Sequence, residues 1–175
     1  MRPLVRTYVY CAVALLLAGC GKEIGDACQL NTDCDPSGAR FCDISASDPN
    51  GYCTIMGCDY NTCPSEAECV EFFMGTFANE PCDPATEGLL GSGGTHVCNL
   101  DEICDLSGFC AAKASEVRYC MRTCQSNGDC RGQGYECRTF DLMKAHGGQV
   151  VLPPGQVDGP STPGFCVVAP ATGSG

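Results

Sequence analysis

Eighteen cysteines in a chain of 175 residues constrain the fold of this protein more than any other feature of its sequence. Cytosolic thiols are kept reduced, so this density indicates either an oxidising compartment or a set of metal sites. Structural zinc sites usually contain cysteine pairs with two residues between them, and no such pair occurs here. We therefore expect disulfides rather than metal ligands, and no metal site.

The first residues have the pattern of an export signal. Arg2 and Arg6 form a positive start, and an uncharged stretch of 13 residues follows from Thr7 to Gly19. As a helix this stretch would be about 20 Å long, whereas the hydrocarbon layer of a membrane is roughly 30 Å thick, so it is short for a permanent span. We expect residues 1–19 to be a signal peptide that is removed on export.

The end of this segment, Leu17-Ala18-Gly19-Cys20, resembles the lipobox of bacterial lipoproteins. The resemblance implies that signal peptidase II recognises Leu17, Ala18 and Gly19 and cuts before Cys20, whose thiol carries diacylglycerol and whose new amine is usually acylated. Two or three acyl chains hold a protein on a membrane almost permanently. Gly21, rather than an aspartate, follows the modified cysteine, which by the sorting rule of that family favours the outer membrane. The alternative is an ordinary secretory leader followed by a coincidental cysteine.

Processing leaves an even number of cysteines. Cys11 leaves with the leader and Cys20 is consumed by lipid, so 16 of the 18 remain, enough for eight disulfides. These are Cys28, Cys34, Cys42, Cys53, Cys58, Cys63, Cys69, Cys82, Cys98, Cys104, Cys110, Cys120, Cys124, Cys130, Cys137 and Cys166.

An internal repeat restricts the pairing. Residues 28–34 (CQLNTDC) align with residues 124–130 (CQSNGDC), and residues 51–55 (GYCTI) with residues 164–168 (GFCVV); a third cysteine lies between the two motifs in each copy. For each copy we predict a knottin-like pairing of first with third and second with fourth cysteine, and residues 98–110 repeat part of the pattern. The predicted pairs are Cys28–Cys42, Cys34–Cys53, Cys124–Cys137 and Cys130–Cys166, with the partners of the other eight cysteines left open.

We predict a small disulfide-rich fold of short β-hairpins and loops, with little helix outside the signal peptide. Short aromatic and β-branched runs bounded by glycine, such as residues 135–140, indicate strands, and residues 70–77 a buried strand or an exposed partner-binding patch. Residues 64–68 favour one helical turn, and the Gly- and Pro-rich residues 81–95 and 147–163 favour loops. The expected organisation is a lipid anchor and tether (20–27), a first cysteine-rich module (28–80), a loop-rich middle segment (81–119), a second module (120–168) and a disordered tail (169–175).

Two pairs of polar residues recur within the repeats. Asn31 and Asp33, like Asn127 and Asp129, are residue types that cap their own turns through side-chain hydrogen bonds. The alternative is a set of calcium ligands, although no loop has the alternating acids and terminal glutamate of an EF-hand.

Charge and residue inventory disfavour several functions. The net charge is −11, and removal of Arg2 and Arg6 leaves 8 basic and 21 acidic residues, or −13, which argues against a nucleic-acid partner. The histidines, His96 and His146, lie in Gly-rich segments where an imidazole is hard to orient. A redox pair at Cys120 and Cys124 would require free thiols. We expect no enzyme, no catalytic residue and no cofactor other than the lipid on Cys20.

The mature chain resembles the uncharacterised cysteine-rich lipoproteins of myxobacteria-like Gram-negative bacteria, on the strength of its repeated Asp-Cys and Gly-aromatic-Cys signatures. The resemblance implies a periplasmic or surface-exposed envelope protein that contacts the membrane through its lipid and a possible protein partner in the envelope or outside the cell. One alternative is an inhibitor of a secreted protease, which would present the segment between Cys137 and Cys166 with its Pro153-Pro154 pair. An extracytoplasmic enzyme is less favoured.

Overall fold

The computed structural model describes residues 21–44, 50–74, 80–87, 98–132, 134–156 and 158–170. These contain short strands and little helix, which confirms the predicted fold class. The elements are β1 (Ala27–Cys28), α2 (Asn31–Cys34), β2 (Phe41–Asp43), β3 (Gly51–Thr54), β4 (Ala67–Phe73), β5 (Glu102–Cys104), β6 (Cys110–Ala112), β7 (Glu116–Cys124), β8 (Tyr135–Arg138), α3 (Phe140–His146), β9 (Gln149–Val150) and β10 (Gly164–Val168), with single 3-10 turns at Lys113–Ser115 and Asn127–Asp129.

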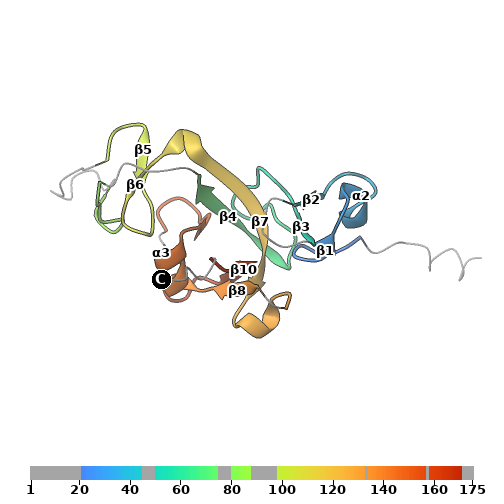
Figure 1. Cartoon of the computed structure of the whole chain (residues 1–175). Helices are drawn as coiled ribbons and strands as arrows, with labels where there is room; N and C mark the ends of the chain where they lie inside the picture. The colour runs from blue at the N-terminus through green and yellow to red at the C-terminus, as the bar shows by residue number, and fades with distance from the viewer. Residues whose placement is uncertain are drawn as a thin grey trace, which may run out of the picture.

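The strands form three antiparallel sheets (Figure 1). The first has the order β1-β3-β2, the second β8-β10-β7-β4-β9, and the third is the hairpin β5-β6. The long strands β4 and β7 cross the middle of the molecule, with β1, β2, β3 and α2 at one end and β5 and β6 at the other (Figure 1). The five-stranded sheet thus combines strands from both cysteine-rich segments, which share one sheet and one core.

All sixteen cysteines after Cys20 pair with one another, and the pairs fall into four units of the same design. In each unit the first cysteine bonds to the third and the second to the fourth, as the repeat predicts for the first and last units. The disulfides are Cys28–Cys42 and Cys34–Cys53, Cys58–Cys69 and Cys63–Cys120, Cys82–Cys104 and Cys98–Cys110, and Cys124–Cys137 and Cys130–Cys166.

The strand register repeats together with the disulfides. The third and fourth cysteines of every unit lie directly opposite each other on antiparallel strands, as Cys42 opposite Cys53, Cys69 opposite Cys120, Cys104 opposite Cys110, and Cys137 opposite Cys166. The third unit is nested inside the second, because it lies in the connection between the third and fourth cysteines of that unit. Each unit is therefore a pair of antiparallel strands that two disulfides tie to the chain preceding it.

The middle segment differs from the sequence interpretation. The partial repeat was expected to start at Cys98, but the unit starts at Cys82, whose amide donates to the Gly108 carbonyl at 2.9 Å. Cys98 is the second cysteine of the unit and Cys104 the third. The five-residue spacing between these two equals the first spacing of the first and fourth units by coincidence, and the longer spacing from Cys82 to Cys98 obscures the true alignment.

Equivalent aspartates stabilise the turns of the first and fourth units. Asp33 Oδ2 accepts hydrogen bonds from two preceding backbone amides at 2.8 and 3.0 Å, and Asp129 Oδ2 does so at 2.9 and 2.8 Å. These backbone hydrogen bonds lower the pKa of both carboxyl groups. The predicted role of the aspartates as turn caps is confirmed.

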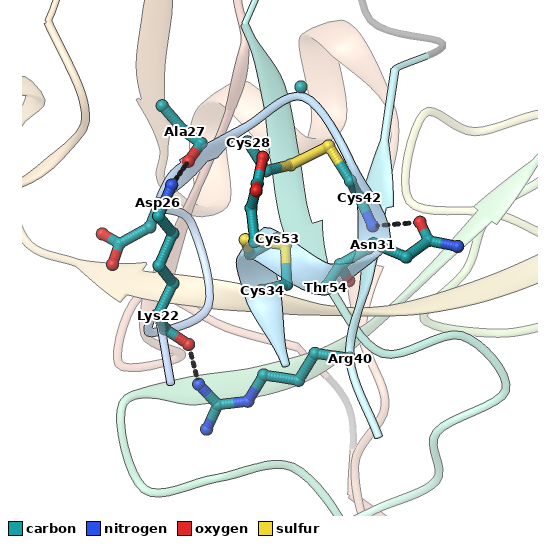
Figure 2. Close-up of a disulfide and its surroundings, with 12 residues drawn as sticks. Lys22, Asp26, Ala27, Cys28, Asn31, Cys34, Arg40, Cys42, Cys53 and Thr54 are labelled. Carbon is teal, nitrogen blue, oxygen red and sulfur yellow. Dashed lines mark hydrogen bonds between the residues drawn. A yellow bond between two sulfur atoms is a disulfide. The ribbon is translucent and has the colours of Figure 1, made fainter. Parts of the chain in front are cut away.

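The asparagines have a different role from the predicted one. Asn31 Oδ1 accepts a hydrogen bond from the Cys42 amide at 3.0 Å (Figure 2), and Asn127 Oδ1 accepts one from the Cys137 amide at 2.8 Å. Each asparagine therefore connects its turn to the third cysteine of the unit instead of capping the turn. The distance in sequence, about ten residues, is why the turn pattern does not reveal this contact.

The glycine of the Gly-aromatic-Cys motif is required by close packing. A Cβ atom at Gly51 would overlap the sulfur of Cys42, and one at Gly164 would lie 2.9 Å from the Cys137 sulfur. In both units the third cysteine therefore occupies the space that a side chain would need. The glycine of the motif is therefore a consequence of where the disulfide lies in the unit.

Tyr52 joins the first unit to the fourth. Its ring stacks on that of Tyr135 with a centroid distance of 5.9 Å, and the Arg131 guanidinium lies 4.6 Å from the Tyr135 centroid. The Tyr52 hydroxyl donates to the Cys166 carbonyl at 3.2 Å and accepts from the Arg122 amide at 3.0 Å. Burial raises the pKa of Tyr52, so the hydroxyl stays neutral and keeps both bonds.

Three segments differ from the predicted secondary structure. Residues 64–67 form a turn, closed by a bond from the Ala67 amide to the Pro64 carbonyl, instead of a helical turn. Residues 147–163 contain β9 as well as loop, because Gln149 and Val150 pair with β4 in the sheet. Phe140 begins α3 rather than ending a strand, which places Met143 fully inside the core.

The segment expected to be a tether is packed against the first unit. Ile24 is 0 % exposed and belongs to the main core, and the Gly25 amide donates to the Cys53 carbonyl at 2.9 Å. Burial of an isoleucine contributes about 1.5–3 kcal/mol, enough to hold a short segment in place. The chain is therefore ordered from residue 21, directly after Cys20.

Candidate binding cleft

A cleft of about 900 Å³ lies between the third unit and the edge of the five-stranded sheet. The third unit contributes apolar side chains on one side together with the charged Glu87, Glu102 and Lys113, while β4, β7 and β9 contribute a polar floor. The side chain of Leu100 is 98 % exposed to solvent. An exposed apolar side chain that adjoins further apolar side chains is typical of an interaction site. Lining side chains include Glu71, Leu100, Glu102, Ile103, Leu106, Glu116, Arg118, Gln149, Val150, Leu152 and Asp158.

A row of polar residues crosses three strands at the floor of the cleft. The register places Glu71 of β4 opposite Arg118 of β7 on one side and opposite Gln149 of β9 on the other. Gln149 Nε2 donates to Glu71 Oε1 at 2.6 Å, and Arg118 Nη2 lies 3.4 Å from Glu71 Oε2. Gln149 Oε1 also accepts from the Leu106 amide at 3.0 Å, which links the third unit to the sheet.

The floor carries more negative than positive charge. Arg118 bonds to Glu116 and lies 3.1 Å from Asp59, in addition to its contact with Glu71, so one guanidinium serves three carboxylates. Burial raises the pKa of Glu71, and the negative charge of Glu116 raises it further. A cationic group entering the cleft would relieve this repulsion.

Asp158 is a second acidic group at the cleft with an altered environment. Its Oδ1 atom is buried and has no hydrogen-bond partner among the residues that the structure describes. Burial raises the pKa of Asp158 to about 6. The cleft thus combines apolar side chains with more carboxylates than cationic groups, a combination suited to a ligand that is both basic and apolar.

Of the predicted site residues, the disulfide cysteines Cys98 and Cys104 line the cleft. Leu17, Ala18, Gly19 and Cys20 fall outside the described residues, as does His96. His146 ends α3, where its Nδ1 lies 3.0 Å from Glu136 Oε1, so this imidazole is held by a partner and is not in a mobile loop.

Both cysteines considered for a redox role form disulfides with other partners. Cys120 bonds to Cys63 and Cys124 to Cys137, so the two do not form a dithiol pair. The segment between Cys137 and Cys166, considered as a presented inhibitory loop, instead contains α3 and β9, and Met143 and Val150 from it are buried in the core.

The cleft residues carry only a weak signal in the sequence. Glu71 is an acid within an apolar run, which hints at a buried partner, but Arg118 is far away in sequence and faces it only through the β4–β7 register. Asp158 lies in a Gly- and Pro-rich segment and shows no signal at all.

Comparison with known proteins adds no relative. The chain matches no protein-family model, no curated protein and no solved structure at a significant level.

Within the residues that the structure describes, no helix is long and apolar enough to cross a membrane. Eight disulfides indicate that the protein works in an oxidising, extracytoplasmic compartment.

Proposed function

We propose that this protein is a lipid-anchored lipoprotein of the bacterial envelope or cell surface, held at the outer rather than the inner membrane, which acts as a rigid binding module. The proposal rests on one observation: the sixteen cysteines that follow Cys20 all form disulfides with one another. Cys20 therefore has no disulfide partner among them and is left to the lipobox chemistry that its neighbours resemble.

The binding role is supported by the cleft. Crosslinked units present its walls with little ordering cost on binding, and Leu100 offers apolar surface at its edge. The charged groups of the floor are bound to one another, Glu71 and Glu116 by Arg118, an arrangement that suits electrostatic recognition better than proton transfer. We propose an envelope or extracellular protein partner that presents a basic, partly apolar segment. The inhibitor alternative receives less support because α3 and β9 of the loop concerned pack onto the core.

Anchoring is tested by replacing Cys20 with alanine in the exporting bacterium. The parent should incorporate labelled palmitate and have the mass of the processed chain, whereas Cys20→Ala should incorporate none and should keep residues 1–19. Cys11→Ala is the matched control, because it removes a cysteine from the leader without touching the lipobox. Palmitate incorporation into Cys20→Ala equal to that into the parent would show that the anchoring proposal is wrong.

Binding is tested by crosslinking in intact envelopes with the parent and with Leu100→Ser. A partner that is captured by the parent, identified, and lost in the variant would support the cleft as the binding surface. Capture that is unchanged by Leu100→Ser and by Asp158→Asn would place the interaction outside the cleft.

A further inference from the structure

We propose that the first unit rests directly on the lipid headgroups, with the third unit and its cleft held at the end of the molecule that faces away from the membrane. The inference rests on the proposed lipidation of Cys20. It adds an interaction surface, the face around Gly21, and a partner of defined chemistry, the headgroup layer of a phospholipid bilayer.

The chain is held by the protein body from the first residue after Cys20. A Cβ atom at Gly21 would lie 3.1 Å from the Cys34 carbonyl oxygen, so this glycine lies against the end of α2. The Lys22 carbonyl accepts a hydrogen bond from Arg40, and Lys22 Nζ donates to the Ala27 carbonyl at 2.7 Å (Figure 2). These contacts precede the fully buried Ile24, which leaves no free spacer between the acylated residue and the folded unit.

The dimensions leave little room for a gap. Ile24 is four positions after Cys20, and a fully extended chain covers at most about 14 Å over four residue steps. The headgroup layer on one side of a bilayer occupies roughly 5–8 Å of this span, because the whole bilayer is about 40–45 Å thick and its hydrocarbon core about 30 Å. The core of the protein therefore begins within about 10 Å of the headgroup surface.

The face around Gly21 is compatible with a headgroup surface. A hollow of about 380 Å³ beside Gly21 is lined by Asp35 and Arg40 as its charged residues, and Lys22 follows in the chain. This neighbourhood carries charges of both signs, because Glu23 follows Lys22 and Glu66 lies 3.3 Å from Arg40, in a chain whose net charge without its leader is −13, from 8 basic and 21 acidic residues. Residues 36–39 are small and exposed, so this face would rest on the headgroups without inserting a large apolar side chain.

The opposite end of the molecule carries the cleft. β1 and α2 lie at one end of the molecule and the β5-β6 hairpin at the other (Figure 1). Since the cleft is lined by the third unit, which contains that hairpin, anchoring at the first end would turn it toward the solvent.

The three lysines of the mature chain allow a direct test. Lys22 adjoins the anchor, Lys113 follows β6 in the third unit, and Lys144 lies in α3. The lipidated protein is bound to vesicles of phosphatidylethanolamine and phosphatidylglycerol and treated with an amine-reactive reagent that does not cross membranes. Cys20→Ala protein exported with an ordinary cleavable secretory leader in place of residues 1–19 is soluble and sets the intrinsic reactivity of each lysine. We expect the Lys22 adduct to be lost on vesicles and the Lys113 and Lys144 adducts to be retained.

A linker variant separates geometry from other causes of protection. Fifteen Gly and Ser residues inserted between Cys20 and Gly21, beginning with Gly to preserve the residue after the lipobox, would add about 20 Å of flexible reach. This variant should recover the Lys22 adduct, whereas the same insertion at the C-terminus should not.

The outcomes distinguish the two proposals. A parent protein that fails to float with the vesicles would refute lipid anchoring itself. A parent that floats while Lys22 reacts as in Cys20→Ala would overturn the present inference alone. Protection of Lys22 that persists with the inserted linker would also overturn it, because the missing spacer would then not be its cause.

Discussion

Asp158→Asn should remove a pH-dependent instability from the cleft. In the folded protein the pKa of this buried carboxyl is raised to about 6, whereas its ordinary value is 3.8. The folded state therefore holds its proton up to a higher pH than the unfolded state does. Between about pH 4 and pH 6, Asp158 is ionised in the unfolded state but still protonated in the folded state. The free energy of unfolding therefore falls as the pH rises through this window and levels off above it. An asparagine has no proton to lose.

The size of the effect follows from the shift. A difference of about two pKa units corresponds to about 3 kcal/mol, and because the side chain keeps part of its contact with water we expect roughly 1–2 kcal/mol. The free energy of unfolding of the disulfide-intact protein should be measured by urea titration at pH 4 and pH 8. The stability of Asp158→Asn relative to the parent should rise by that amount between the two conditions.

A surface carboxylate supplies the control. The side chain of Asp141 is 91 % exposed, and Asp141→Asn should change stability by only a few tenths of a kcal/mol at either pH. Equal effects of Asp158→Asn at pH 4 and pH 8 would refute the reasoning, since they would mean that this carboxyl ionises alike in the folded and unfolded states.

Three further substitutions test the architecture. Gly51→Ala should lower the free energy of unfolding by about 1–3 kcal/mol, because the new methyl group overlaps a disulfide sulfur, whereas Gly159→Ala, with no atom within 4 Å of the added carbon, should be nearly neutral in the same urea titration. Tyr52→Phe should cost about 1–3 kcal/mol by thermal unfolding, since its two backbone partners lose a buried hydroxyl, and an unchanged midpoint would show that the contact between the units does not depend on it. Gln149→Leu removes the bond to the third unit and should speed amide hydrogen exchange across residues 98–106; unaltered exchange there would argue against this link.

The disulfide pattern shows how far local sequence reasoning extends. The pairing of the first and last units was predictable because their motifs recur with the same spacing, and Asp33 and Asp129 bond amides only three or four residues away. The same reasoning failed for Cys98, because it relied on a spacing that two different positions of the unit share. It also assigned Asn31 to its own turn, although the partner amide is on a strand eleven residues further along.

The candidate cleft could not be predicted from the sequence, for a related reason. Its floor depends on which residues of β7 and β9 face Glu71, and register is a property of paired strands that no single segment specifies. Likewise, the sequence of residues 21–27 looks like a polar spacer, and only the assembled core, whose other members come from distant segments, explains why Ile24 is buried.

The sequence by itself determined the even number of cysteines, the crosslinked hairpin as the building unit and the disulfide pairing wherever that unit recurs intact, because these depend on residue types and on short spacings. The tertiary structure decided that one unit is nested inside another, with Cys63 and Cys120 bonded across 57 positions, and that charged side chains of three strands meet at one cleft. The physical reason is that contacts between distant segments are selected by the free energy of the whole packed core, to which each segment contributes only part.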